Sequence, residues 1–188
     1  MKAHQPTLWS DEDGVIAIYE PHAYRPSPTN PNPAFFQPNV HYYKTVTPDN
    51  TIIQVYNELQ KYIPFYVLTN LTEEFPLWQE HKTDKIEWTH EHLPFLNMET
   101  QFHAIHIPKW QYAQKILQRP LCKSDILISD YNKDLFPWAQ AGGTAVKYLN
   151  GINSKESYEG PHISNQWTIS DIIRYLQNIL NHTNQKGR

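Results

Sequence analysis

Short apolar runs alternate with longer amphipathic segments along this chain. Residues 63–68 form a continuous apolar run of strand length, which is typical of a strand buried on both faces. Residues 125–129 predict another buried strand, and residues 102–107 and 144–149 predict two further short strands. Residues 7–19, TLWSDEDGVIAIY, combine a short strand, an acidic turn and an apolar continuation. The pattern therefore predicts a strand at each of these places.

Helices are predicted between the strands, where apolar residues recur every three to four positions or where a long stretch is rich in charge. The predicted ranges are residues 49–62, 74–93, about 110–119, 133–141 and about 169–181. Asp49 or Asn50 can cap the first helix, and Thr168 with Asp171 forms a capping box before the last. Gly142 is a typical signal for the end of a helix.

Strands that alternate with helices indicate βαβ units and a mostly parallel sheet with helices on both faces. Because such crossovers are right-handed, the expected fold is an open, doubly wound α/β fold. Ligands bind at the carboxyl ends of the strands in folds of this kind. The residues that follow each strand are therefore the candidates for function.

Composition narrows the class of protein. A length of 188 residues favours a single domain, and no apolar run reaches the roughly 18–20 residues of a membrane helix. The first residues lack the apolar stretch of a signal peptide, and a single cysteine, Cys122, fits a reducing cytoplasm and a small core residue. A net charge of −3 argues against a non-specific nucleic-acid binder. The oligomeric state is left open.

Prolines and aromatic residues crowd into residues 20–48. Proline excludes a regular helix or a central strand there, and a disordered linker would carry fewer aromatic side chains. We expect an ordered, irregular subdomain or long loop. Its aromatic residues are candidates either for the core of that subdomain or for stacking on a ligand.

Polar side chains follow the predicted strands in a chemically suggestive order. They are Asp11, Glu12, Asp13 and Gly14, then Thr69 and Asn70, then Lys109, and finally Asp130 and Asp134. Carboxylates from separate strands suit Mg²⁺, whereas a lysine and a hydroxyl suit a phosphoryl group. Lys109 directly follows its strand, unlike the nearby Lys115 and Lys123.

Each of these features also has a purely structural interpretation. The DEDG segment and the Asp130–Asp134 pair are compatible with solvated acidic turns, Thr69 with a helix cap, and Lys109 with an ordinary surface lysine. The histidines contain no HExxH pattern, so a histidine metal site is not expected. The order of the acidic, hydroxyl and basic positions favours the functional interpretation.

The segments DEDGV, VLTN, IPKW and ILISDYNKD resemble, in this order, the four motifs of the haloacid-dehalogenase-like (HAD) phosphohydrolases. The stretch DILISDYNKDLFPWAQAGGTAVKYLNGIN is similar to the end of the 5'(3')-deoxyribonucleotidase branch and its phage and bacterial relatives. The resemblance implies a HAD-like Rossmannoid domain over residues 1–188, with a small cap at about residues 20–48.

The resemblance also implies catalytic roles. Asp11 would be the nucleophile that forms an aspartyl-phosphate, and Asp13 would act as general acid and then general base. Thr69 would donate a hydrogen bond to a phosphoryl oxygen. Lys109 would neutralise the nucleophile and the transferring group.

For the metal, the resemblance implies Mg²⁺ held by Asp11, the Asp13 carbonyl and Asp130, with Asp134 as the second acid of the fourth motif. Many members of the branch have two adjacent aspartates in this motif, and Ser129 stands at the first of these positions here. The departure puts metal affinity in question, but not the fold.

For the substrate, the resemblance implies a small phosphorylated molecule, with a nucleoside monophosphate favoured. Gly14 would let the turn approach the phosphate, and Asn70, Tyr42 and Tyr43 are the other candidates for substrate contact. Two alternatives are a catalytically weak protein that binds a phosphorylated metabolite or a protein partner, and a phosphatase for another small ester such as a sugar phosphate. No nucleic-acid or membrane partner is expected.

Overall fold

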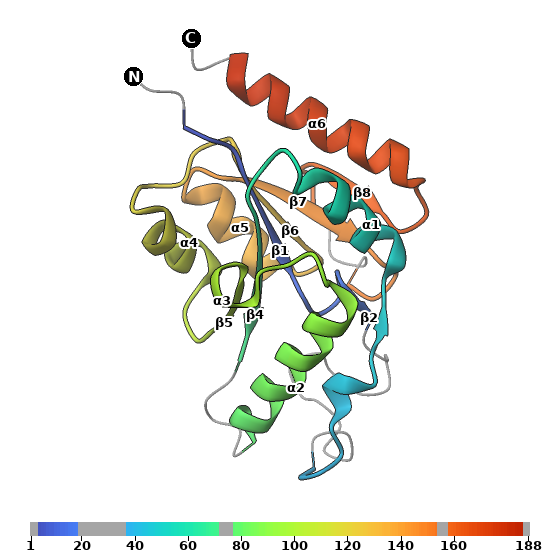
Figure 1. The fold of residues 1–188 in the computed structure, drawn as a ribbon. Helices are drawn as coiled ribbons and strands as arrows, with labels where there is room; N and C mark the ends of the chain where they lie inside the picture. The colour runs from blue at the N-terminus through green and yellow to red at the C-terminus, as the bar shows by residue number, and fades with distance from the viewer. Residues whose placement is uncertain (1–3, 19–36, 72–76, 154–157, 186–188) are drawn as a thin grey trace.

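Parallel strands form the centre of the computed structural model, which describes residues 4–18, 37–71, 77–153 and 158–185. The strands of the main sheet are β1 (Thr7–Asp11), β4 (Phe65–Asn70), β5 (Phe102–Ile105), β6 (Asp125–Ser129), β7 (Thr144–Leu149) and β8 (His162–Ser164). They lie in the order β5-β4-β1-β6-β7-β8, and every neighbouring pair is parallel (Figure 1). The predicted mostly parallel α/β sheet is confirmed.

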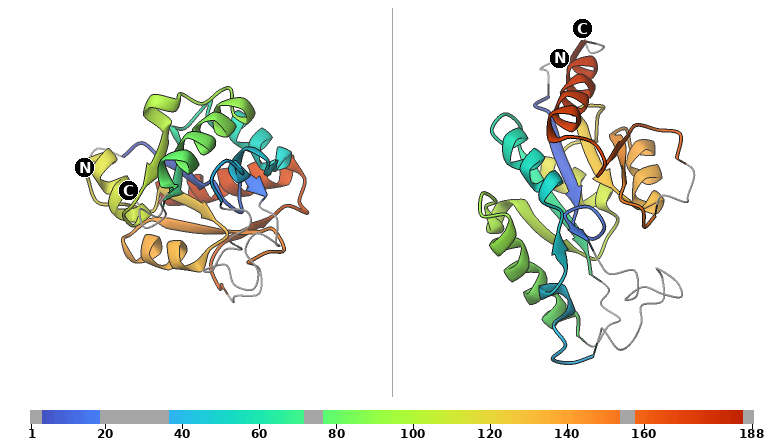
Figure 2. Two further views of the ribbon diagram at one scale, coloured as in Figure 1. Left: turned by 90° about the horizontal axis from the view of Figure 1, so that it is seen from below. Right: turned by 90° about the vertical axis from the view of Figure 1, so that its right-hand side faces the viewer.

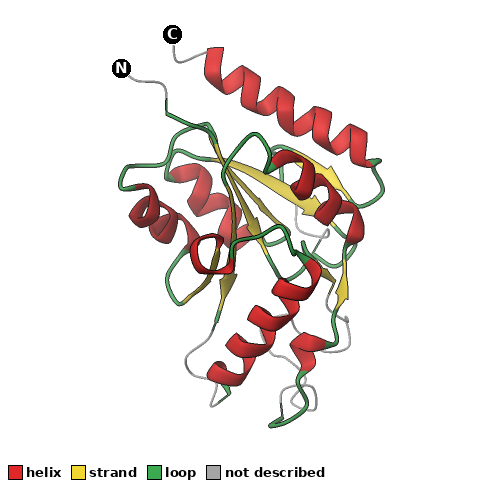
Figure 3. Cartoon of the chain, viewed as in Figure 1, coloured by secondary structure: helices red, strands yellow, loops and turns green. Residues whose placement is uncertain are grey.

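Helices cover both faces of this sheet (Figure 3). They are α1 (Asn50–Leu59), α2 (Trp78–His92), α3 (Met98–Gln101), α4 (Lys109–Leu117), α5 (Asn132–Gln140) and α6 (Ile169–Gln185). The central strand β1 shows the two layers: Leu8 packs in a core cluster with residues of α1 and α6, and Trp9 packs in a second cluster with residues of α4 and α5. Both residues are fully buried, which explains why apolar side chains occur on both faces of the strand.

The helix ends follow the predicted signals. Asp49 accepts hydrogen bonds from the backbone N–H groups of Thr51 and Ile52 at the start of α1. The Thr168 hydroxyl accepts from the Asp171 N–H before α6 and donates to the Asp171 carboxylate. Each predicted helix is present within a few residues, whereas α3 and β8 were not predicted because both are very short.

A small antiparallel pair, β2 (Ala17–Ile18) and β3 (Thr47–Pro48), lies just after β1. The predicted irregular subdomain falls between these two strands, and its residues 19–36 lie outside the described residues. Its described end contains the short 3₁₀ helix η2 (Tyr42–Lys44), which packs against α2. Figures 1 and 2 place α2 and η2 beyond the carboxyl ends of the central strands. Within the described ranges, no helix is long and apolar enough to cross a membrane.

Candidate active site

The polar residues predicted from the strand ends gather around the carboxyl ends of β1 and β6. Asp11 ends β1, Asp130 directly follows β6, and Lys109 begins α4. Because β1 and β6 are hydrogen-bonded neighbours in the same direction, their ends reach the same edge of the sheet. This adjacency brings together residues that are more than a hundred positions apart in the sequence.

Asp11 is held on both of its carboxylate oxygens and is only 7% exposed. Its Oδ1 accepts a hydrogen bond of 2.9 Å from the backbone N–H of Glu12. Its Oδ2 lies 2.5 Å from Lys109 Nζ and accepts a hydrogen bond of 3.0 Å from the Ser129 hydroxyl. Lys109 Nζ is also 2.7 Å from Asp134 Oδ2, so one buried ammonium forms ion pairs with two carboxylates.

The single lysine does not offset the burial of these acids. Burial raises the pKa of Asp11 to about 8, against the opposing effect of the Lys109 charge, and the charges of Asp134 and Asp130 add to the rise. Burial alone would lower the pKa of Lys109, but the attraction of Asp11 and Asp134 outweighs it and raises that pKa. The buried acids therefore outnumber the cation beside them, and a bound metal cation would favour their charged forms.

Asp130 is the second buried carboxylate and is 2% exposed. Its Oδ2 accepts hydrogen bonds from the side-chain amides of Asn150 (3.0 Å) and Asn153 (2.8 Å). These amides do not fully offset burial, which raises the pKa of Asp130 to about 6. The sequence did not identify these two amides as part of the site, because an asparagine pair in a turn carries no chemical signal of its own.

Only glycine fits at position 14 beside the Asp130 carboxylate. Its φ is +75°, and a Cβ atom at this position would lie 2.2 Å from Asp130 Oδ2. Its carbonyl oxygen accepts a hydrogen bond of 2.5 Å from the Asn150 amide, which therefore links the turn after β1 to the end of β6. Gly14 thus allows the turn and Asp130 to approach closely.

Ser129 occupies the position where the resemblance led us to expect an aspartate. Its hydroxyl donates to Asp11 Oδ2 and accepts a hydrogen bond of 3.2 Å from the Tyr131 N–H. A second carboxylate here would face Asp11 directly and add like charge. The serine instead supplies a hydrogen-bond donor to the predicted nucleophile.

Thr69 and Asn70 end β4, next to β1. Thr69 is fully buried, and its hydroxyl lies close enough to Glu12 to favour the charged form of the Glu12 carboxylate. The hydroxyl nevertheless has no partner at hydrogen-bond geometry among the described residues. A buried hydroxyl without such a partner is uncommon, so its donor capacity is available to a ligand. The Asn70 side chain is exposed.

Asp13 contacts Lys85, a residue that the sequence analysis did not identify as part of the site. Its Oδ1 lies 2.8 Å from Lys85 Nζ on α2, and the same ammonium is 2.9 Å from Glu12 Oε2. Lys85 is 1% exposed, and its pKa is raised because the Asp13 and Glu12 charges outweigh burial. Thr89, one turn further along α2, donates to Glu12 Oε1 at 3.2 Å.

The two tyrosines that were predicted to contact substrate have different environments. Tyr42 is almost fully buried and belongs to the main core cluster. Tyr43 is only partly buried, and Lys85 Nζ lies 4.1 Å from the centroid of its ring. Tyr43 is thus linked, through Lys85, to the acidic turn after β1.

The donor set around β1 and β6 fits a hard divalent cation. Asp11 and Asp130 are buried carboxylates with raised pKa values, and Gly14 leaves space beside Asp130 that a side chain would fill. Mg²⁺ is bound by one or two carboxylates and keeps several of its waters. The Asp13 carboxylate is paired with Lys85, whereas Asp11 and Asp130 are the buried carboxylates at the ends of two neighbouring strands, so these two are best placed for the ion.

Comparisons with known proteins find this fold in solved structures. No family model and no curated protein matches the chain. The similar solved structures include D,D-heptose 1,7-bisphosphate phosphatase from Burkholderia thailandensis (TM-score 0.62, 12% identity, covering 92% of this chain and 99% of that one). They also include a HAD-superfamily hydrolase from Ehrlichia chaffeensis (TM-score 0.54, 12% identity, 96% and 100%) and a HAD hydrolase of family IA, variant 3, from Entamoeba histolytica (TM-score 0.58, 14% identity, 93% and 100%).

The chain therefore has the fold of the HAD-superfamily hydrolases over nearly its whole length. At these identities the likeness concerns the fold, and function must be argued from the site.

Proposed function

We propose that this protein is a Mg²⁺-dependent phosphomonoester hydrolase that acts through an aspartyl-phosphate. One observation carries the proposal: the buried Asp11 carboxylate at the end of β1 is aligned by Lys109 and Ser129 beside a second buried carboxylate, Asp130. A buried acid with a strongly shifted pKa and a specific charge partner is typical of a functional site.

In the proposed reaction, a carboxylate oxygen of Asp11 attacks the phosphorus atom, and the bond from phosphorus to the ester oxygen breaks. Asp13 gives a proton to the departing oxygen. Asp13 then takes a proton from a water molecule, whose oxygen attacks the phosphorus of the aspartyl-phosphate. The bond from phosphorus to Asp11 breaks, which releases inorganic phosphate and restores the carboxylate.

The neighbouring groups support these steps through charge and hydrogen bonding. The Lys109 ammonium, 2.5 Å from Asp11 Oδ2, orients the nucleophile and offsets charge on the transferring group. The Thr69 hydroxyl is a donor for a phosphoryl oxygen. Mg²⁺, held by Asp11 and Asp130 with the Asp13 carbonyl, would supply electrostatic stabilisation of the phosphoryl oxygens.

For the substrate, we propose a nucleoside monophosphate of the kind cleaved by 5'-nucleotidases. The supporting feature is Tyr43, a partly buried aromatic residue beside the Lys85–Asp13 pair, which offers a ring for stacking on a base. A sugar phosphate is the alternative, since one of the similar structures is a heptose bisphosphate phosphatase.

The test is phosphate release from a panel of nucleoside monophosphates, sugar phosphates and p-nitrophenyl phosphate, with Mg²⁺ or with EDTA. We expect Mg²⁺-dependent turnover and a loss of several powers of ten in kcat for Asp11→Asn, because an amide is a far weaker nucleophile. Asp171→Asn, at the exposed start of α6, is the matched control. If Asp11→Asn retains activity within about threefold of wild type, the covalent mechanism is wrong.

A further inference from the structure

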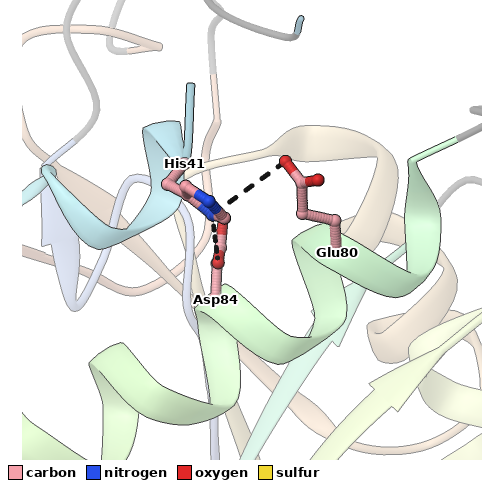
Figure 4. A group of neighbouring side chains, drawn as sticks. All are labelled: His41, Glu80 and Asp84. Carbon is pink, nitrogen blue, oxygen red and sulfur yellow. Dashed lines mark hydrogen bonds and ion pairs between the residues drawn. The ribbon is translucent and has the colours of Figure 1, made fainter. Parts of the chain in front are cut away.

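A histidine and two carboxylates converge where η2 packs against α2 (Figure 4). Glu80 and Asp84 are one helical turn apart on α2, so both project from the same side of the helix. His41, at the start of η2, reaches them from a separate segment. Among the described residues, this is the group of three whose ligand atoms all lie within 4.8 Å of one another.

The distances suit a single coordination sphere. His41 Nδ1 lies 3.0 Å from Asp84 Oδ1 and 4.0 Å from Glu80 Oε1. Ligand atoms about 2.0–2.2 Å from a shared ion are separated by about 2.8–3.6 Å in adjacent positions of tetrahedral or octahedral geometry. The separation between His41 and Asp84 is thus already within this range, and the separation between His41 and Glu80 exceeds it only slightly, so a small side-chain adjustment would bring all three onto one ion.

The burial pattern also suits a bound ion. Asp84 is 1% exposed, which is costly for a carboxylate unless it is paired. The His41 side chain is 43% exposed, so one side of the group stays open to water. Three protein ligands with an open fourth position form a common arrangement for a divalent transition metal ion.

The carboxylates around the group outnumber the neighbouring ammonium groups, which favours binding of a cation. Glu80, Asp84 and Glu87 bring three carboxylates to this face, and Lys44 is the neighbouring ammonium, 2.6 Å from Glu87 and 3.6 Å from Asp84. Lys44 therefore pairs more closely with Glu87 than with the triad. It nevertheless competes with an ion for Asp84, which makes Lys44 a useful probe of the site.

We propose that His41, Glu80 and Asp84 form a binding site for a Zn²⁺-type transition metal ion, separate from the Mg²⁺ site at Asp11 and Asp130. An imidazole with two carboxylates suits Zn²⁺ or Co²⁺, whereas Mg²⁺ prefers oxygen ligands alone. The ion would fasten η2 to α2. Because α2 also carries Lys85, the ion would fix the helix that contacts Asp13.

Cobalt is the probe, because Co²⁺ occupies such sites and its visible absorption reports nitrogen ligation. The titration uses the full chain in the Asp11→Asn background with saturating Mg²⁺, so that neither phosphatase activity nor the Mg²⁺ site contributes. We expect one Co²⁺ per chain, displaced by Zn²⁺ but not by Mg²⁺. Each of His41→Asn, Glu80→Gln and Asp84→Asn should weaken Co²⁺ binding by more than about tenfold.

Two further variants make the test specific. Glu87→Gln lies on the same helix outside the triad and should retain the Co²⁺ spectrum, whereas Lys44→Gln should tighten binding because it removes a competing cation. Asparagine replaces His41 because it tolerates the left-handed backbone at this position (φ 52°). Glu80→Gln removes a ligand without leaving a fully buried group unpaired, so it covers the case in which Asp84→Asn fails to fold.

The proposal is wrong if wild-type and Asp11→Asn proteins bind no Co²⁺ in the presence of Mg²⁺, or if Glu80→Gln and His41→Asn bind it as well as their parent does. These outcomes concern metal binding alone, so they leave the proposed hydrolase reaction untouched. Conversely, an inactive protein that still binds Co²⁺ at this triad would reject the hydrolase and keep the metal site.

Discussion

The two ends of β6 each carry a buried aspartate, and the two aspartates have opposite environments. Asp125, at the start of the strand, accepts two hydrogen bonds from Arg119 (2.6 and 2.8 Å), one from Thr7 and one from the Cys122 N–H. Burial would raise the pKa of Asp125, but these hydrogen bonds outweigh burial and lower that pKa. Asp130, past the other end, receives amide hydrogen bonds that do not offset burial, and its pKa is raised.

The difference separates an aspartate whose charge the protein itself compensates from one that we propose binds a metal ion. Asp125 is satisfied by the protein itself and ties β6 to β1 through Thr7. Asp130 remains electrostatically incomplete, as does Asp11 beside it. This agrees with the general behaviour of parallel α/β folds, in which ligands bind at the carboxyl ends of the strands.

The largest expected effects come from replacing each aspartate by asparagine. Asp125→Asn leaves Arg119 without its charge partner and should lower the free energy of unfolding by about 3–5 kcal/mol, while the kcat of the folded protein changes little. Asp130→Asn should abolish Mg²⁺-dependent turnover and leave the metal-free stability equal or higher, because it removes an uncompensated buried charge. Denaturant unfolding and phosphate release measure both. Equal loss of stability in the two variants would contradict the comparison.

Lys85, on helix α2, contacts the predicted general acid Asp13 and allows a second test of the site. Lys85→Met should misplace Asp13 and lower kcat for alkyl phosphates about ten- to a hundredfold, because their leaving groups need a proton. Turnover of p-nitrophenyl phosphate, whose leaving group departs as an anion, should fall much less. Lys82→Met, on the exposed side of α2, is the control. Equal losses on both esters would show that Lys85 only maintains the fold.

Replacing Tyr43 tests whether the substrate carries a nucleobase. Tyr43→Ala should raise KM for a nucleoside monophosphate about five- to a hundredfold, because one base stack contributes roughly 1–3 kcal/mol. KM for p-nitrophenyl phosphate should scarcely change, because this ester has no base. Tyr42→Phe, within the core, is a control that keeps the ring. If both esters lose equally on Tyr43→Ala, nucleotide selectivity must come from another part of the protein.

The smallest expected effect is on the pH dependence of stability without metal. Because the pKa values of Asp11 and Asp130 are raised in the folded state to about 8 and 6, the folded protein holds protons that the unfolded chain releases above about pH 4. Their contribution to stability therefore falls as pH rises through 6 and 8, whereas the contribution of Asp125 is lost only in acid.

Melting temperatures measured in EDTA between about pH 5 and 9 test this sign. Asp130→Asn should fall less steeply than wild type across pH 6, and saturating Mg²⁺ should raise the wild-type melting temperature most at the alkaline end. A wild-type curve that is identical with Mg²⁺ and with EDTA would contradict a preformed metal site.

The sequence by itself determined the sheet and the centre of the site. Parallel strands buried on both faces are mostly apolar, so β6 was predicted at its observed bounds, residues 125–129. Because parallel strands end at one edge, the polar residues Asp11, Lys109 and Asp130 could be placed together before the structure was known. The resemblance in motif order added their proposed roles.

Only the tertiary structure decided the contacts made by α2. This helix is rich in charge, so its sequence does not indicate which lysine is buried; packing selects Lys85 and leaves Lys82 exposed. Lys85 meets Asp13 across 72 positions, and His41 meets Asp84 across 43. Likewise, packing buries Tyr42 and leaves Tyr43 partly exposed. Local patterns report which residues share a strand or helix face, but contacts between distant segments depend on how those faces pack, and no local pattern records that.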